Sequence, residues 1–70
     1  MMKKIIIDSN IRHGKPTIEG TRITVEDVLG MLENGMSYEE IQQEYDLTKE
    51  DILLVIRYVA SMIKGEEIII

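Results

Sequence analysis

Hydrophobic residues recur at helical spacing in three segments of this chain, and each segment follows a capping signal. A Ser or Thr precedes each segment and an Asp or Glu stands three positions later, the pattern of a capping box that satisfies the free backbone N–H groups of a helix start. Gly35 and Gly65 are placed to end the first and third segments. The pattern predicts helices over residues 25–34, 38–45 and 49–64, with caps at Thr24, Ser37 and Thr48.

The third predicted helix is apolar over more of its circumference than two short helices can cover. At about 100° per residue, one half of its circumference carries Ile52, Leu53, Val55, Ile56, Val59, Ala60, Met62 and Ile63. Leu54 and Tyr58 lie outside that arc, which predicts that this helix lies at a subunit interface and that both side chains contact a partner. The alternative is that they are isolated exposed hydrophobic residues, which are normal on protein surfaces.

The segments that flank the helices are predicted to be extended. Residues 4–7 and 67–70 are rich in isoleucine and too short for helices, and residues 15–22 carry Pro16 and Gly20 at a spacing typical of a hairpin. A terminal strand in so small a domain would leave an open edge, so we expect it to pair with another chain. The alternative is that residues 68–70 fray in solution.

A chain of 70 residues makes one domain. We expect a mainly α fold in which a basic extended or hairpin arm (residues 1–23) precedes a three-helix, helix-turn-helix core (residues 24–64) and a C-terminal strand (residues 65–70). So small a core buries only about 60% of the surface that the unfolded chain exposes. Association into a homodimer would supply the missing apolar burial.

The composition gives little basis for chemistry. Cysteine is absent and His13 is the sole histidine, so neither a thiolate metal site nor a nucleophile beside a base is expected. The acidic pairs near the helix starts are explained by capping and by the helix dipole. We therefore expect no enzyme activity, no metal and no cofactor. The apolar run near the N-terminus ends at Asp8, too early for a signal or membrane segment, which predicts a cytoplasmic protein without a membrane contact.

Charge is distributed unevenly along the chain. Residues 1–22 hold five basic and two acidic residues, 5 − 2 = +3, and residues 23–70 hold three basic and eleven acidic residues, 3 − 11 = −8. The first part favours a polyanion as partner, and the second favours a basic protein surface. The alternative is that these charges only form a solvated surface.

The second and third predicted helices are separated by the short turn of a helix-turn-helix motif. A recognition helix presents its early residues to the DNA bases, and here these include Lys49, Glu50 and two leucines. Because acids repel phosphates, the basic arm is the better candidate for DNA contact. The predicted DNA-binding residues are Arg12, Lys15, Arg22 and Lys49.

Residues 14–25, GKPTIEGTRITV, resemble the signature G-K-P-x-I-x-G-T-R-I-x-V of a short prokaryotic family of domains of unknown function. Residues 35–41 and 45–52 extend the similarity, which covers nearly the whole chain. The resemblance implies a homeodomain-like helix-turn-helix protein and, as for many members, a VapB-like antitoxin encoded beside a PIN-like ribonuclease toxin. The matching signature residues are Gly14, Lys15, Pro16, Ile18, Gly20, Thr21, Arg22 and Val25.

The resemblance and the charge pattern together predict an antitoxin-type regulator that binds operator DNA and a co-encoded toxin. Only six residues follow the helical core, so we expect the toxin contact to include this short acidic and apolar end. The predicted partner-binding residues are Leu54, Tyr58, Glu66, Glu67, Ile68, Ile69 and Ile70. Two alternatives remain open at this point: Arg22 pairs with Asp8 in a purely structural role, and the protein is an adaptor or dimerisation module that does not bind DNA.

Overall fold

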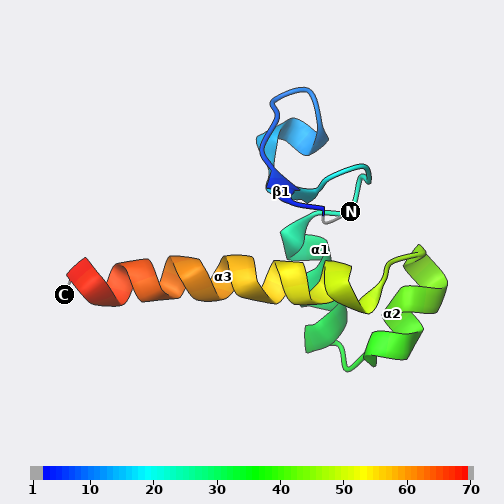
Figure 1. The fold of residues 1–70 in the computed structure, drawn as a ribbon. Helices are drawn as coiled ribbons and strands as arrows, with labels where there is room; N and C mark the ends of the chain where they lie inside the picture. Colours follow the sequence, from blue (N-terminus) through cyan, green and yellow to red (C-terminus); the bar gives the residue numbers. More distant parts are fainter. Residues whose placement is uncertain (1–2, 70) are drawn as a thin grey trace.

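The computed structural model describes residues 3–69 of the chain and the side chains of residues 3–64. A two-stranded sheet near the N-terminus is followed by three α-helices, in the order β1, η1, β2, α1, α2, α3 (Figure 1). The expected mainly helical fold with a small N-terminal sheet is thereby confirmed.

The sheet is built from two strands that are distant in sequence. β1 (Ile5–Ile6) pairs antiparallel with β2 (Thr17–Ile18), and Ile5 lies opposite Ile18. The connection between the strands contains η1 (Arg12–Gly14), a single turn of 3-10 helix. After β2 the chain turns at Gly20, whose φ is +79°, and the Ile18 N–H donates to the carbonyl oxygen of residue 23 at 3.0 Å. The predicted turn within residues 15–22 is therefore present, and it leads directly into α1.

Each helix begins at the predicted cap. α1 (Val25–Glu33) starts behind Thr24, whose hydroxyl accepts a hydrogen bond from the Asp27 N–H at 2.9 Å, while the Asp27 carboxylate accepts one from the Thr24 N–H at 3.0 Å. The same reciprocal pair at Ser37 and Glu40 starts α2 (Tyr38–Tyr45). Such an N-cap contributes about 1 kcal/mol to stability.

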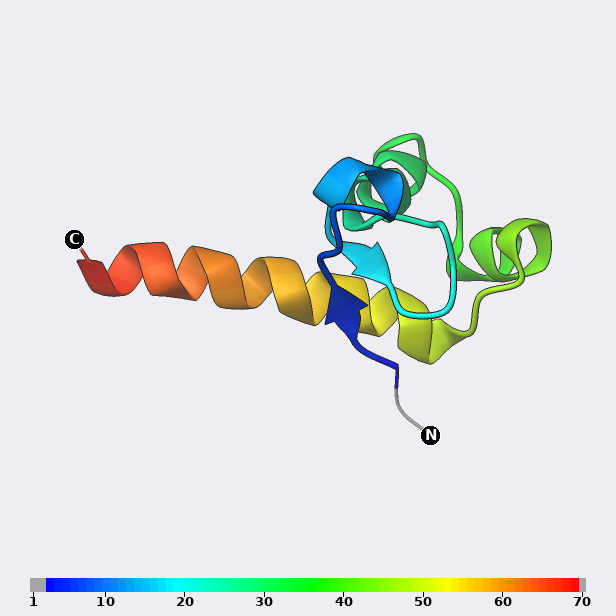
Figure 2. The ribbon, with the colours of Figure 1, turned by 90° about the horizontal axis from the view of Figure 1, so that it is seen from above.

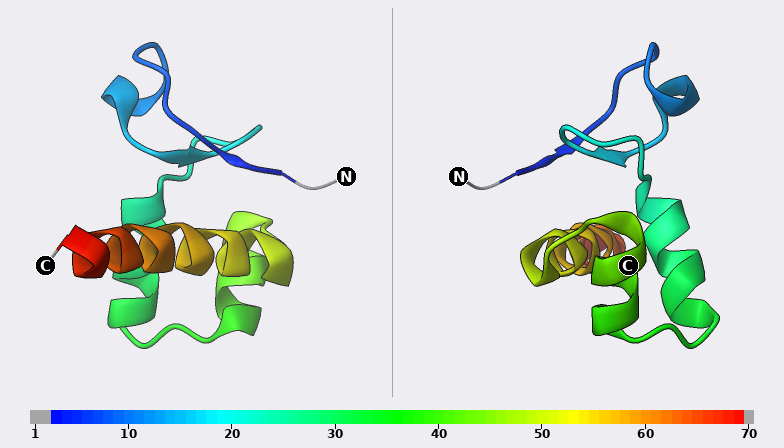
Figure 3. Two further views of the ribbon diagram at one scale, coloured as in Figure 1. Left: turned by 60° about the vertical axis from the view of Figure 1, so that its left-hand side comes forward. Right: turned by 90° about the vertical axis from the view of Figure 1, so that its right-hand side faces the viewer.

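A three-residue connection separates α2 from α3 (Lys49–Ile69). Asp46 adopts the left-handed conformation that ends α2 (φ 53°, ψ 41°), and the side chain of Leu47 is buried. Thr48 and Asp51 then form the third capping box. In Figure 3, α1 and α2 stand side by side and α3 crosses both of them, in agreement with the contacts that α3 makes to each.

The hydrophobic core lies where β2, α1, α2 and α3 meet. It is aliphatic, as the low aromatic content requires, and β1 covers α3 from the arm side. The buried hydrophobic residues are Ile18, Val25, Val28, Ile41, Leu47, Ile52 and Val55.

α3 runs well past the rest of the domain (Figures 1 and 2). Of the apolar half of this helix, Ile52 and Val55 are buried, whereas Met62 and Ile63 are 55% and 53% exposed. No other element of residues 3–69 extends far enough to cover these two residues.

The prediction of a helix end at Lys64 and a strand over residues 65–70 is wrong for residues 65–69, because α3 continues to Ile69. A formed helix gains one hydrogen bond for each residue that it adds, and glycine inside a helix costs only about 1 kcal/mol. A strand gains its hydrogen bonds only from a partner strand. Ile70 lies outside the described residues.

Candidate functional site

Three ion pairs attach the basic arm to the helices. We use the name arm for residues 3–23, which include the sheet and its connections. The pairs are Lys3 Nζ with Asp51 Oδ2 at 3.2 Å, Arg12 Nη2 with Asp27 Oδ2 at 3.5 Å, and Lys15 Nζ with Glu26 Oε1 at 3.1 Å. Three cations of the arm, including the predicted DNA-binding residues Arg12 and Lys15, are therefore already matched by carboxylates of the same chain.

Asp51 is the buried member of these pairs, with 4% of its surface exposed. Its carboxylate accepts hydrogen bonds from the Thr48 N–H at 2.9 Å and from Lys3 Nζ at 3.2 Å. Burial by itself raises the pKa of Asp51, but the bonds from Thr48 and Lys3 outweigh burial and leave the pKa below its usual value. Asp51 thus couples the start of α3 to the start of the arm.

The other two pairs lie at the surface, at the start of α1. The pKa of Asp27 is lowered, first by the hydrogen bond from the Thr24 N–H and further by the nearby charges of Arg12 and Lys15, against a smaller opposing effect of burial. Lys15 and Glu26 are both more than half exposed. Exposed pairs of this kind contribute about 0–1 kcal/mol to stability, so they hold the arm against α1 only weakly.

Arg22 does not pair with Asp8, so this structural alternative is wrong. Arg22 is exposed, no ion pair involves it among the described side chains, and Asp8 accepts a hydrogen bond from the Asn10 N–H at 2.8 Å. The antiparallel register is the reason. Asp8 follows β1 at one end of the sheet, whereas the turn that contains Arg22 follows β2 at the other end.

Lys49 is exposed at the first position of α3, where acids surround it in sequence. Glu50 forms an ion pair with Arg57 at 3.5 Å, and Asp51 is buried as described above. Lys49 thus belongs to the start of α3, whereas Arg12 and Lys15 pair with the start of α1.

Leu54 and Tyr58 are half-buried, and Tyr58 packs against the hydrophobic core. Their predicted role at a partner surface assumed that only two helices cover α3, whereas β1 covers it as well. Glu66, Glu67, Ile68 and Ile69 belong to the last turns of α3, and their side chains, like the whole of Ile70, lie outside the described part of the chain.

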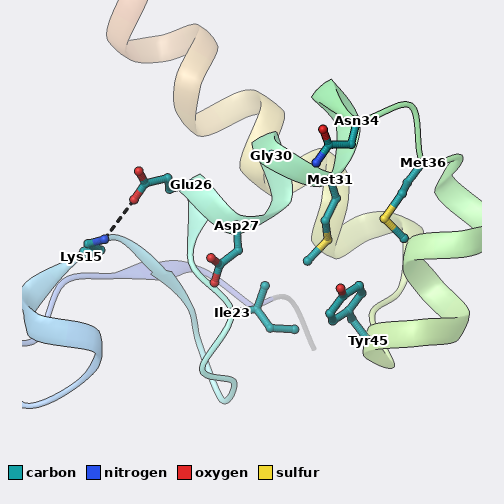
Figure 4. A pocket seen from close by; sticks show the side chains of 9 residues that line it. All are labelled: Lys15, Ile23, Glu26, Asp27, Gly30, Met31, Asn34, Met36 and Tyr45. Carbon is teal, nitrogen blue, oxygen red and sulfur yellow. Dashed lines mark hydrogen bonds and ion pairs between the residues drawn. The ribbon is translucent and has the colours of Figure 1, made fainter.

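A groove lies along α1, and its apolar lining residues Ile23, Met31 and Met36 pack against the edge of the core (Figure 4). It has a volume of about 710 Å³ and runs between the arm, α1 and the end of α2. Its floor is apolar and its rim includes the Lys15–Glu26 pair. The lining residues are Lys15, Ile23, Glu26, Asp27, Gly30, Met31, Asn34, Met36 and Tyr45.

The sequence interpretation missed this groove because its lining comes from three elements that only the fold brings together. Two local signals point to it. Gly30 interrupts the helical pattern of α1, and residues 23–48 contain no Lys or Arg.

Among the described side chains, no group of three His, Cys, Asp or Glu is arranged to hold a metal ion. No helix in the described part of the chain is long and apolar enough to cross a membrane.

Comparison with models of known protein families gives a match for this chain. No curated protein and no solved structure matches the chain. A family model described as "Protein of unknown function (DUF433)" matches residues 5–59, from β1 through the covered half of α3. The match includes the arm, α1 and α2 and therefore all three elements of the groove. The chain belongs to the DUF433 family.

Proposed function

We propose that this chain is a dimeric regulator of the antitoxin type, which binds operator DNA and neutralises a co-encoded PIN-like ribonuclease. The observation that carries the proposal is the pair α2 and α3, two helices with capped starts joined by residues 46–48. A connection of about three to four residues is typical of helix-turn-helix domains. We assign the helices a homeodomain-like role on this basis and on the signature in residues 14–25.

The DNA contact is assigned to Arg12, Lys15, Arg22 and Lys49. All four side chains are exposed. The carboxylates that pair with Arg12 and Lys15 hold them by surface ion pairs of small net strength, so a phosphate can take the place of the carboxylate. Contacts of this kind position a protein on DNA without reading its sequence.

The dimer contact is assigned to the projecting end of α3, which we define as residues 60–69. The apolar face that packs on the core continues along this end, where Met62 and Ile63 are more than half exposed. A second copy can cover this face through the same face of its own, as two-fold symmetry requires. A monomer mass in light scattering at micromolar concentration would contradict this assignment.

Toxin binding is assigned to the acidic part of the chain. Glu39, Glu40 and Glu44 are exposed on α2, and Glu66 and Glu67 follow near the end of α3. A ribonuclease needs a cationic surface for its substrate, and an acidic protein can cover that surface by electrostatic complementarity. Titration of the co-encoded nuclease with this chain should abolish cleavage of RNA.

The DNA assignment is tested by the salt dependence of binding. Replacing Arg12, Lys15 and Arg22 together by Ala should weaken binding to duplex DNA for all sequences alike and lower the salt slope by up to about three phosphate contacts. The matched control replaces Arg57 and Lys64, two cations of α3 outside the arm, and should leave the slope unchanged. Equal losses in the two variants would remove the arm from the DNA contact.

A second function, a protein adaptor without DNA binding, is favoured by one observation. Arg12 and Lys15 pair with Asp27 and Glu26, so half of the proposed DNA-binding cations serve to hold the arm on α1. An adaptor would show no salt-dependent binding to duplex DNA at all, whereas the regulator would lose affinity steeply as salt rises. The same titration therefore separates the two functions.

A further inference from the structure

Gly30 lies in the interior of α1, and nothing within the described chain requires a glycine there. Its φ is outside the left-handed range, and a Cβ built at this position would meet no atom within 4 Å. Glycine is the least favourable residue inside a helix apart from proline. Close approach of another molecule to the helix backbone would account for a glycine at a position where this chain has room for a side chain.

The groove around Gly30 has the character of a protein-docking surface. Its floor combines Ile23, Met31, Met36 and Tyr45, with Tyr45 40% exposed. Methionine side chains are flexible and adapt to the shape of an apolar partner. In Figure 4, the side chains of Met31, Met36, Ile23 and Tyr45 point toward the same space, and Gly30 lies on α1 next to Met31.

The helices that border the groove carry an excess of negative charge. The two acidic residues of the lining are paired, Glu26 with Lys15 and Asp27 with Arg12, so the excess comes from the other acids of α1 and α2. Residues 23–48 carry no Lys or Arg, and their acidic residues are Glu26, Asp27, Glu33, Glu39, Glu40, Glu44 and Asp46. Among the described side chains, only Glu26 and Asp27 of this set form an ion pair. The other five are exposed on or just after α1 and α2. Their combined field attracts a cation and repels an anion, including a nucleic-acid phosphate.

We propose that the groove across Gly30 is the docking site for a cationic, apolar segment of a partner protein, whose backbone approaches α1 at this glycine. The proposal rests on the proposed function, because it locates on this chain a contact with the partner protein. It adds the groove to the acidic residues of α2 and of the end of α3 to which toxin binding is assigned above. Apolar side chains of the segment fill the space between Met31, Met36 and Tyr45, and its Lys or Arg residues face the carboxylates of α1 and α2.

The test uses the full chain and two synthetic helical peptides with one apolar pattern, a Leu/Lys peptide and its Leu/Glu counterpart. Fluorescence anisotropy should show binding of the Leu/Lys peptide only. Gly30→Gln places a long side chain in the groove and should weaken that binding by at least about tenfold, which corresponds to about 1.4 kcal/mol. Because glutamine is a good helix former, the variant should remain folded and melt no lower than the unaltered chain.

Gly30→Ala gives a sharper result, because stability and binding should change in opposite directions. The added methyl group meets no atom of the chain, so the melting temperature should rise by several degrees. Peptide affinity should fall, by less than in Gly30→Gln. Leu29→Gln is the matched control, since it places the same side chain at an exposed position of α1 outside the groove. It should leave affinity unchanged.

Three outcomes would overturn the proposal: no binding of the Leu/Lys peptide, equal binding of the Leu/Glu peptide, or equal losses in Gly30→Gln and Leu29→Gln. A dimer that Gly30→Gln dissociates would also overturn it, because a second copy would then fill the groove. The DNA titration described above is run on Gly30→Gln as well. If Gly30→Gln loses peptide binding but keeps the salt slope of DNA binding, the docking site in the groove and the DNA contact of the arm are independent of each other.

Discussion

The two halves of α3 share one sequence pattern and have different surroundings. In the first half, Ile52 and Val55 are buried, Asp51 is held by Thr48 and Lys3, and β1, α1 and α2 all contact the helix. In the projecting end, Met62 and Ile63 continue the same apolar face but are more than half exposed (Figure 2). The DUF433 match ends at residue 59, close to the border between the two halves.

This difference shows that an amphipathic pattern specifies a face but not what covers it. In a domain this small, the hydrophobic core extends along α3 only as far as the other elements of the domain cover it. Beyond that point, the helix of a single chain is stabilised only by its own hydrogen bonds, which is marginal for a short helix in water. The following predictions measure the difference, in order of decreasing effect.

Truncating one isoleucine in each half should separate the halves most clearly. Ile52→Ala removes a fully buried side chain and should lower the free energy of unfolding by about 3 kcal/mol, whereas Ile63→Ala should lower it by less than about 0.5 kcal/mol at concentrations at which the chain is a monomer. Urea denaturation of both variants gives the comparison. If Ile52→Ala does not fold, the pair Ile52→Val and Ile63→Val replaces it, with about 1 kcal/mol expected for the first. Equal effects would mean that the projecting end is covered in solution.

Removing the carboxylate of Asp51 should have the next largest effect. Asp51→Ala deletes one side of the third capping box and leaves Lys3 without its partner, so we expect a loss of about 2 kcal/mol, in the range for hydrogen bonds to charged groups. Glu50→Ala, which removes the neighbouring exposed carboxylate, is the control and should change stability by less than about 0.5 kcal/mol. Similar values for both would show that the buried link between arm and α3 adds nothing.

Acid should weaken the same link, by less than deletion of the side chain does. The pKa of Asp51 and that of Asp27 are lowered in the folded chain, so the unfolded chain binds more protons in acid. Their contribution to stability is complete above the unfolded pKa, near 4, and is lost as the pH falls through the lower folded pKa. Thermal unfolding between about pH 5 and pH 2 measures this loss. Asp51→Asn should show a shallower decline, and an unchanged slope would contradict the assignment.

Deleting residues 65–70 should have the smallest effect on the stability of the monomer, a few tenths of a kcal/mol, because the buried core ends at Val55. Circular dichroism should show a loss of helix confined to the missing turns, with an unchanged melting temperature. Light scattering on the same variant tests whether the projecting end holds the dimer. A large loss of stability would show that residues 65–70 pack on the domain.

The sequence by itself determined where the helices begin. The boxes at Thr24, Ser37 and Thr48 act through hydrogen bonds over three residues, so no distant part of the chain is needed to form them. The turn at Gly20 was predictable for the same local reason. The buried positions of α1 and of the first half of α3 also followed from helical periodicity.

Only the tertiary structure decided the rest, because it depends on residues that are distant in sequence. The pairing of β1 with β2 places Asp8 and Arg22 at opposite ends of the sheet, and it brings Lys3 to Asp51. The isoleucines before residue 70 have strand propensity, but a strand needs a partner, and the helix that precedes them supplies hydrogen bonds without one. The groove at Gly30 likewise exists only because the arm and α2 lie on either side of α1.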